Sequence, residues 1–304
     1  MMDTIQRASV ISFPMLGGLR LNPPAYFTLF GRPIYFYGVL IGLGFLLGIT
    51  FAASRARRFG LKEDDVYDVM IWVIPFSILG ARLYYVLFQW DYYARHLNEL
   101  LAVWNGGLAI YGGVIAGALT AYLVCRHKKI PFPAMLDCLC FGLLPGQIIG
   151  RWGNFMNREA FGAETAVFCR MGLTAPDGTT VYVHPTFLYE SLWNLGVLLF
   201  LLWFEQSGKR RFDGHCVTLY FLFYGLGRFW IEGLRADSLY LGSTGIRVSQ
   251  ALSLVLVIAA AAVLIIKHRQ PFSPGDLYVN RVAAQEAAVI IENTHKEESE
   301  NGGL

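Results

Sequence analysis

The chain has 304 residues, of which 55% are hydrophobic and 15% are charged, and its formal net charge is +3. Soluble domains of this size carry charged side chains at nearer a quarter of their positions, so the apolar excess must face something other than water. This composition excludes an ordinary soluble protein and favours a membrane protein. We expect no nucleic-acid partner.

Seven apolar segments, taken in chain order, are candidates to cross a membrane. Ile34–Ser54 and Leu100–Cys125 are uncharged and long enough for a hydrocarbon core of ~30 Å. Other segments contain internal charges, among them Arg82, Arg151 and Arg228, which weaken their hydropathy signal. We therefore predict an all-α polytopic membrane protein. The predicted spans cover about 34–54, 66–90, 106–125, 134–155, 188–204, 215–234 and 247–266.

Basic residues follow every odd-numbered predicted span. Because such clusters favour the cytoplasmic side, the amino terminus is predicted outside and the carboxyl terminus in the cytoplasm. An even number of crossings would break this alternation. The clusters are Arg55, Arg57, Arg58 and Lys62; Arg126, Lys128 and Lys129; Lys209, Arg210 and Arg211; and Lys267 and Arg269.

Residues 1–269 are predicted to form the membrane domain and residues 270–304 a polar cytoplasmic tail. The tail ends in HKEESENGGL and has too few apolar residues for a core. We therefore expect disorder, or one short amphipathic helix near Val282–Ile291.

Glycines spaced four residues apart recur in the predicted spans. Small residues at this spacing let helix backbones approach closely in lipid, so they predict close helix packing. The pairs are Gly38 with Gly42, Gly44 with Gly48, Gly113 with Gly117, Gly142 with Gly146, and Gly146 with Gly150.

Gly150–Gly162 reads GRWGNFMNREAFG and lies at the predicted outer end of the fourth span. Arg151 at a membrane boundary is costly unless a partner or an anionic ligand balances its charge. A structural alternative is that this arginine only reaches lipid headgroups. The neighbouring amides and carboxylate, which include Asn154 and Glu159, favour a binding site instead.

Tyr224–Asp237 reads YGLGRFWIEGLRAD. Arg228, Glu232 and Arg235 are spaced four and three residues apart, so they share one helical face with Tyr224. An internal ion pair is the structural alternative, because a charge buried in a membrane almost always has a partner. Two arginines against one carboxylate nevertheless leave surplus positive charge. That surplus favours an anionic ligand such as phosphate, whose oxygens a guanidinium matches bidentately.

Two further blocks lie at predicted outer ends of spans. NGGLAIYGGVIAG contains Tyr111, and Tyr37 lies at the predicted outer end of the first span. Each tyrosine alone is more typical of an interfacial anchor than of a catalytic group. HPTFLYE places His184 before the fifth span and Glu190 at its start. With no second His or Cys at metal spacing, a zinc site is not indicated. No metal and no cofactor are expected.

These four blocks, in their order along the chain, resemble the bacterial phosphatidylglycerol–prolipoprotein diacylglyceryl transferases over about Tyr26–Arg269. GRWGNFMNREAFG is similar to that family's signature. The resemblance implies transfer of the diacylglyceryl group of phosphatidylglycerol to the lipobox cysteine thiol in a prolipoprotein signal peptide, with release of glycerol 1-phosphate. It also implies a multi-pass protein of the bacterial cytoplasmic membrane, with its active site toward the outer leaflet.

The resemblance further implies roles for ten residues. Arg151 would bind the headgroup, and Arg228 would be a second cation facing the phosphate. The implied substrate-binding residues are Arg151, Asn154, Gly162, Glu232 and Arg235. The implied catalytic residues are Tyr37, Tyr111, Glu159, Tyr224 and Arg228.

Tyr111 departs from the family pattern, because many members have histidine at this position. A tyrosine with a pKa near ~10 is a poor base at neutral pH unless nearby arginines lower that pKa. Three ways to obtain the thiolate therefore stay open. They are deprotonation by Glu159, deprotonation by Tyr111 beside Arg151, and stabilisation of the thiolate by the two arginines.

A membrane transporter or channel for an organic anion is the alternative function, because intramembrane arginines also mark substrate paths. Such a protein predicts charges distributed through the bilayer depth and often repeat-related halves. The sequence instead places its charges in one layer and shows no such halves. A non-enzymatic membrane scaffold would explain the glycines but not the polar cluster.

Overall fold

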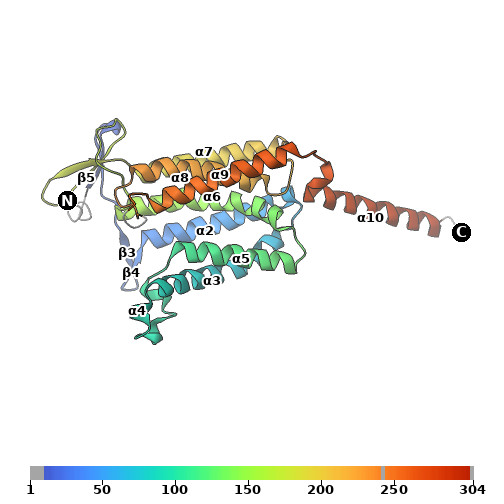
Figure 1. The fold of residues 1–304 in the computed structure, drawn as a ribbon, viewed down its shortest axis with the longest axis horizontal. Helices are drawn as coiled ribbons and strands as arrows, with labels where there is room; N and C mark the ends of the chain where they lie inside the picture. Colours follow the sequence, from blue (N-terminus) through green and yellow to red (C-terminus); the bar gives the residue numbers. More distant parts are fainter. Residues whose placement is uncertain (1–9, 241–243, 302–304) are drawn as a thin grey trace. The chain divides into compact units, whose positions relative to one another are not determined.

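The computed structural model describes residues 10–240 and 244–301 of a mostly helical chain (Figure 1). The chain divides into two compact units. The first consists of Met1–Thr50, Cys140–Arg210 and His215–Pro271, and the second of Phe51–Leu139, Arg211–Gly214 and Phe272–Leu304.

A long helix occupies each of the seven segments predicted to cross a membrane. Within the first unit α8 packs against both α7 and α9, and within the second α3 packs against α5. The helices are α2 (Phe36–Arg55), α3 (Glu63–Phe88), α5 (Ile110–His127), α6 (Phe132–Asn157), α7 (Thr186–Gln206), α8 (His215–Leu234) and α9 (Val248–Arg269).

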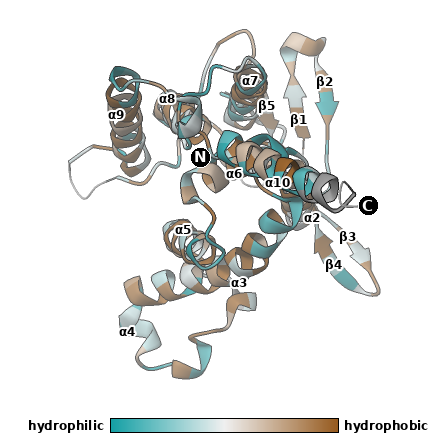
Figure 2. Cartoon of the chain, turned by 90° about the vertical axis from the view of Figure 1, so that its right-hand side faces the viewer, coloured by the Kyte–Doolittle hydropathy of each residue, from teal (hydrophilic) through white to brown (hydrophobic). Residues whose placement is uncertain are grey.

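Five of the described helices are long and apolar enough to cross a membrane, namely α2 with the turn that follows it, α3, α6, α7 and α9. Helix α9 is drawn predominantly in the hydrophobic colour of Figure 2, and side chains such as Val255, Ile258 and Ile266 are exposed on it. Helix α5 ends in Arg126 and His127, and α8 contains Arg228 and Glu232, which lowers their apolar character. The chain is therefore a multi-pass membrane protein, while seven crossings and the orientation of the termini stay predictions.

The fold also contains short β-strands, which the prediction of an all-α protein did not include. Four antiparallel strands in the order β2-β1-β5-β6 form one sheet of the described chain, and β3 and β4 form a hairpin. The hairpin turns through Phe30 and Gly31, both with positive φ, as a two-residue turn of this kind requires. The strands are β1 (Val10–Phe13), β2 (Leu19–Leu21), β3 (Tyr26–Leu29), β4 (Arg32–Tyr35), β5 (Met171–Thr174) and β6 (Thr180–Val183).

The four-stranded sheet packs its apolar side on the ends of α6 and α7. Ile11 and Leu173 are essentially unexposed, and they belong to one buried cluster with Phe155 of α6 and Phe187 of α7. Burial of such side chains stabilises the contact by about 1.5–3 kcal/mol each. The sheet thereby fixes residues 158–185, which connect the two helices and begin with the last part of the signature segment Gly150–Gly162.

The carboxyl-terminal segment is helical over a longer range than the short helix considered for Val282–Ile291. Helix α10 covers Tyr278–Asn301, where disorder was the other expectation. Its first backbone N–H, that of Tyr278, donates to the Asp213 carboxylate at 3.0 Å. A carboxylate at this end favours a helix, because it accepts from an otherwise unpaired N–H and matches the helix dipole. The domain boundary after residue 269 stays a prediction.

The remaining described helical elements are short. They are α4 (Trp90–Tyr93) and the 3-10 turns η1 (Pro14–Leu16), η2 (Ala56–Phe59), η3 (Leu97–Glu99), η4 (Val103–Asn105) and η5 (Pro274–Asp276).

Arg82, a charge inside α3, holds the loop that leads into α5. It is 1% exposed, and its guanidinium donates to the carbonyls of Glu99 at 2.6 Å, Leu100 at 2.9 Å and Gly106 at 2.7 Å. Buried backbone carbonyls need such donors. The charge is therefore part of the packing of the second unit.

Close helix approach is confirmed where α2 meets α6 in the first unit. A Cβ atom on Gly44 would lie 3.3 Å from the Gly146 Cα, and one on Gly48 would overlap the Gly142 carbonyl oxygen. At Gly42 a Cβ atom would meet nothing within 4 Å. Glycine is thus required at the first two positions by backbone contact, as the spacing predicts, and not at Gly42.

We predict that Gly48→Val lowers the free energy of unfolding by about 1–3 kcal/mol, because the new side chain forces α2 and α6 apart. Thermal unfolding in detergent micelles measures this change. Gly42→Val is the matched control, since it adds the same side chain at a position where the new Cβ atom meets nothing within 4 Å. Equal unfolding temperatures for the two variants would contradict the proposed contact.

Candidate functional site

The signature segment leaves α6 in a turn that places Glu159 beside two amides. The Glu159 Oε1 atom accepts from the Nδ2 atoms of Asn154 at 2.9 Å and Asn157 at 3.4 Å. Arg158 and Ala160 have positive φ values of 56° and 55°, which are uncommon for residues with a side chain. The turn therefore needs contacts that hold it in place.

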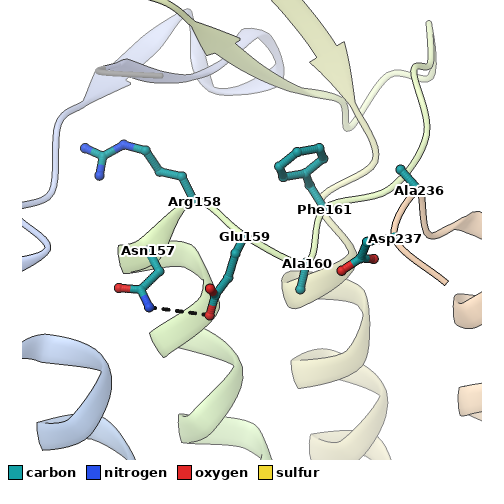
Figure 3. Close-up of a pocket in the computed structure, with 7 residues that line it drawn as sticks. All are labelled: Asn157, Arg158, Glu159, Ala160, Phe161, Ala236 and Asp237. Atoms are coloured by element: carbon teal, nitrogen blue, oxygen red, sulfur yellow. Dashed lines mark hydrogen bonds between the residues drawn. The ribbon is translucent and has the colours of Figure 1, made fainter. Parts of the chain in front are cut away.

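Arg158 supplies one such contact by binding the amino-terminal segment. Its Nη2 atom donates to Asn22 Oδ1 at 2.6 Å and to the Pro23 carbonyl at 2.9 Å. In Figure 3 its side chain extends away from that of Glu159. Burial lowers the pKa of the Arg158 guanidinium below its ordinary value. Arg158 thus anchors the turn to the chain.

A pocket of about 290 Å³ opens beside this turn (Figure 3). Carboxylates come to it from two elements, Glu159 from the turn after α6 and Asp237 from the segment after α8. The pocket has both polar and apolar walls. Its lining residues are Asn157, Arg158, Glu159, Ala160, Phe161, Ala236 and Asp237.

The carboxylate of Glu190 on α7 bridges two arginines of neighbouring helices. Its Oε1 atom lies 2.5 Å from Nη2 of Arg151 on α6, and its Oε2 atom lies 3.0 Å from Nη1 of Arg228 on α8. The side chain of Glu190 is 5% exposed, whereas those of Arg151 and Arg228 are 23% and 16% exposed. One buried anion therefore sets the positions of two cations that remain partly accessible.

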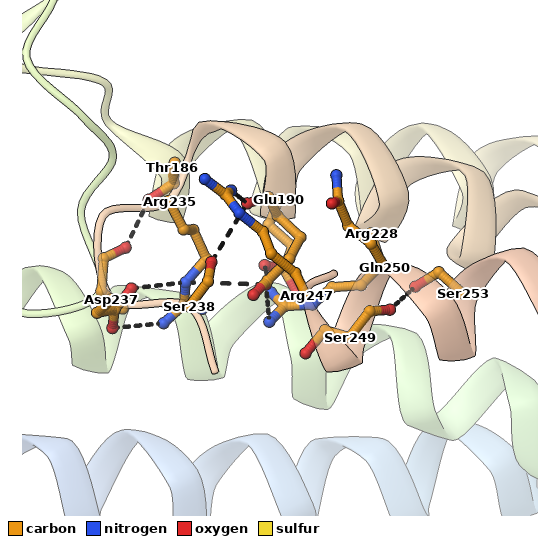
Figure 4. Close-up of polar contacts among 12 residues, drawn as sticks. Thr186, Glu190, Arg228, Arg235, Asp237, Ser238, Arg247, Ser249, Gln250 and Ser253 are labelled. Atoms are coloured by element: carbon orange, nitrogen blue, oxygen red, sulfur yellow. Dashed lines mark hydrogen bonds and ion pairs between the residues drawn. The ribbon is translucent and has the colours of Figure 1, made fainter. Parts of the chain in front are cut away.

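Polar contacts continue from Arg228 along the carboxyl-terminal end of α8 (Figure 4). The second guanidinium nitrogen of Arg228 lies 2.6 Å from Glu232 Oε2, and Arg235 Nε lies 4.0 Å from the same oxygen. Arg235 donates twice to Asp237, at 2.9 and 2.8 Å. Arg247, before α9, donates to the backbone carbonyl of Glu232.

The contacts around Glu159 and those around Glu190 form one network, because Arg151 Nη1 also donates to Asn154 Oδ1 at 3.3 Å. The network runs from Glu159 through Asn154 and Arg151 to Glu190, and continues through α8 to Asp237. Its two ends are the two carboxylates that line the pocket.

The Arg235–Asp237 pair lies beyond the end of α8 and is charged at neutral pH. Burial raises the pKa of the Asp237 carboxyl, but the hydrogen bonds and charge of Arg235 outweigh it and hold that pKa below its ordinary value. Burial likewise lowers the pKa of Arg235, and Asp237 outweighs it, so that pKa is raised. Each group favours the charged form of the other.

Gly162 holds the connection after the signature segment against the end of α8. Its N–H donates to the His184 carbonyl at 2.9 Å, and it forms a β-bridge with Arg235. A Cβ atom here would lie 2.6 Å from His184 Cβ and 2.8 Å from the Leu234 carbonyl oxygen. Only glycine permits this approach, which fixes the backbone at Arg235.

The three predicted tyrosines are placed differently. Tyr37 on α2 lies against Gly153 of α6, where a Cβ atom would be 2.7 Å from its ring. Tyr224 lies one turn before Arg228 on α8 and stacks on Tyr220 with ring centroids 5.5 Å apart. Tyr111 is the second residue of α5 in the second unit, so it belongs to a different unit from the arginine network.

The charge balance corrects one argument from the sequence. Arg228 and Arg235 face Glu232, Glu190 and Asp237, so these two arginines carry no surplus over their contacting carboxylates. Among the described residues, no group of three or more His, Cys, Asp or Glu side chains is arranged to hold a metal ion. An anion at this site would therefore bind to the guanidinium N–H groups that the carboxylates leave unused.

Sequence reasoning assigned no role to Glu190, Asp237 or Arg247. Glu190 carried a usable signal, since a carboxylate inside an apolar span marks a paired or functional group. Asp237 follows the sixth predicted span and Arg247 is the first residue of the seventh, and a charged residue at such a boundary is unremarkable. Their contacts with Arg235 and Glu232 depend on the path of the chain between α8 and α9, which the sequence does not give.

We predict that Glu190→Gln destabilises the protein by about 3 kcal/mol, because it leaves Arg151 and Arg228 without their shared anion. Thermal unfolding in detergent measures the effect. Glu164→Gln is the matched control, since Glu164 is exposed on the connection before β5. A Glu190→Gln variant as stable as this control would show that the bridge contributes nothing.

The family described as prolipoprotein diacylglyceryl transferase matches residues 24–266. The phosphatidylglycerol–prolipoprotein diacylglyceryl transferase of Finegoldia magna is 42% identical over 250 residues, covering 82% of this chain and 97% of that protein. The enzyme of the same name from Enterococcus faecalis is 44% identical over 254 residues, covering 81% and 90%. That from Clostridioides difficile is 45% identical over 232 residues, covering 76% and 90%. The chain belongs to the prolipoprotein diacylglyceryl transferase family.

Proposed function

We propose that the chain transfers the diacylglyceryl group of phosphatidylglycerol to the thiol of a prolipoprotein cysteine and releases glycerol 1-phosphate. The names of its relatives give both substrates. The observation that carries the proposal is the bridge by which Glu190 holds Arg151 and Arg228 side by side in an apolar protein. Two fixed guanidiniums suit one phosphate diester.

The reaction exchanges one bond for another. The cysteine sulfur attacks the carbon of the diacylglyceryl group that bears the phosphate. A carbon–sulfur bond forms, and the bond from that carbon to the phosphate oxygen breaks. The thiol proton passes to a base of the site or to water, and the leaving phosphate gains a negative charge. Arg151 and Arg228 stabilise that developing charge in a site of low dielectric constant, and Glu190 keeps them oriented before the reaction begins.

The substrate-binding residues hold the headgroup and the shape of its site. Arg151 binds the phosphate, and Asn154 orients the Arg151 guanidinium by accepting a hydrogen bond from it. Glu232 and Arg235 position Arg228 on α8, while Gly162 fixes the backbone beside Arg235.

The catalytic residues divide between phosphate and thiol. Arg228 stabilises the charge of the leaving phosphate. Tyr224 lies one turn before Arg228 on the same helix, α8. Tyr37 borders the site where its ring meets α6 at Gly153. Glu159 is one of three open routes to the thiolate, because its Oε2 atom has no partner among the described residues and can accept a proton. Tyr111, on the second unit, and direct stabilisation of the thiolate by the arginines are the other two routes.

The protein acts in the bacterial cytoplasmic membrane, with the site toward the outer leaflet. There it meets phosphatidylglycerol in the bilayer and the lipobox cysteine of a signal peptide. The apolar helices support residence in a membrane. Basic clusters after alternate helices support this orientation. An anion transporter is not favoured, because the relatives are named as transferases.

We predict that Arg151→Ala lowers turnover by about 100-fold or more, since it removes a fixed cation from the developing charge. The assay contains protein in vesicles with phosphatidylglycerol and a lipobox peptide, and mass spectrometry detects the thioether product. Arg170→Ala is the matched control, because Arg170 lies on the connection before β5 and stacks on Tyr182. Full activity of Arg151→Ala would reduce Arg151 to an anchor. No thioether from the wild-type protein would reject the function itself.

A further inference from the structure

The arginine network ends in two carboxylates, Glu159 and Asp237, and both of them line the pocket. Glu159 is two contacts from Arg151, through Asn154, and Asp237 is bound to Arg235. The lining residues 158–161 and 236–237 follow the last residues of α6 and α8. The pocket thus adjoins the proposed phosphate site at the helix ends, outside the apolar spans.

Hydrogen-bonding groups with unused capacity line this pocket. Glu159 uses its Oε1 atom for two amides, while its Oε2 atom has no partner within the described parts of the chain. The Asp237 carboxylate accepts one hydrogen bond from Arg235 at each oxygen, and its side chain is 40% exposed. Carboxylate oxygens accept up to four hydrogen bonds in total, so both groups can accept from hydroxyl donors.

The proposed reaction produces a group with this chemistry. The headgroup glycerol of phosphatidylglycerol carries two free hydroxyls next to its phosphate, and it leaves with that phosphate as a water-soluble product. It needs a polar pocket adjoining the phosphate site and open to water, whereas the diacylglyceryl part needs apolar surroundings. A volume of about 290 Å³ is ample for a glycerol unit with water.

We infer that this pocket is the leaving-group subsite, in which Glu159 and Asp237 accept hydrogen bonds from the headgroup glycerol of phosphatidylglycerol. The inference rests on the proposed function, and it assigns to the pocket recognition of the glycerol rather than of the phosphate. It places Glu159 at the leaving group, so that of the three routes to the thiolate it favours Tyr111 or direct stabilisation by the arginines. Donor selectivity then has two parts: the arginines bind the phosphate that all such lipids share, and the pocket distinguishes glycerol from other headgroups.

Ala236→Leu tests the subsite, because it narrows the pocket without changing a charge or a hydrogen-bonding side chain. Binding of radiolabelled glycerol 1-phosphate and of inorganic phosphate is measured by equilibrium dialysis on the full-length protein in micelles. Ala166→Leu is the matched control, since Ala166 is exposed on the connection between α6 and α7 but does not line the pocket.

We expect the wild-type protein to bind glycerol 1-phosphate more tightly than inorganic phosphate. In Ala236→Leu the Kd for glycerol 1-phosphate should rise about tenfold, the worth of roughly one hydrogen bond. The Kd for inorganic phosphate should stay within about twofold, which also shows that the arginine site remains folded. Ala166→Leu should match the wild type for both ligands.

Equal affinity of the wild-type protein for the two ligands would overturn the inference. So would an unchanged Kd for glycerol 1-phosphate in Ala236→Leu, or an equal rise for both ligands. Dialysis does not depend on transfer, so the two proposals fail separately. Tight glycerol 1-phosphate binding without a thioether product would reject the function, whereas transfer with an unaffected Ala236→Leu would reject the subsite.

Discussion

The bridge from Glu190 to Arg151 and Arg228 is the interaction on which the site depends. A buried carboxylate between two guanidiniums is stable only with both partners, and each arginine in an apolar span needs an anion nearby. The bridge therefore connects α6, α7 and α8 at one level, and it fixes the arginines before any substrate binds. From it one arm leads to Glu159 and the other to Asp237, so the pocket residues take their positions from the same contact.

Packing around the network keeps that geometry in place. The sheet closes over Phe155 and Phe187 near the ends of α6 and α7, and Arg158 ties the signature turn to the amino-terminal segment. Glycines act in the same way, since Gly48 allows α2 to touch α6 and Gly162 allows the connection to touch the end of α8. Apolar side chains are exposed along helices such as α9, and the polar groups of the site are concentrated at the ends of α6 and α8 and the start of α7.

The sequence was sufficient for the helices but not for everything that joins them. The long apolar runs predict α2 and α9 because hydrophobicity alone is enough to identify both helices. The strands escaped because β1 and β5 are four residues each and pair across 160 positions. Helix α10 was underestimated because its amino-terminal cap, Asp213, lies far back in the chain. Arg151, Arg228 and Glu232 could be identified from charge in apolar segments, whereas their balance with Glu190 and Asp237 required the fold.

A structure with phosphatidylglycerol bound, determined by electron cryo-microscopy in lipid nanodiscs, tests the central claim most directly. The measurement is the distance from the lipid phosphate to the guanidiniums of Arg151 and Arg228. The account predicts that phosphate oxygens lie within hydrogen-bond distance of both arginines while each still contacts Glu190. A phosphate bound elsewhere, with both arginines contacting only carboxylates, would contradict it.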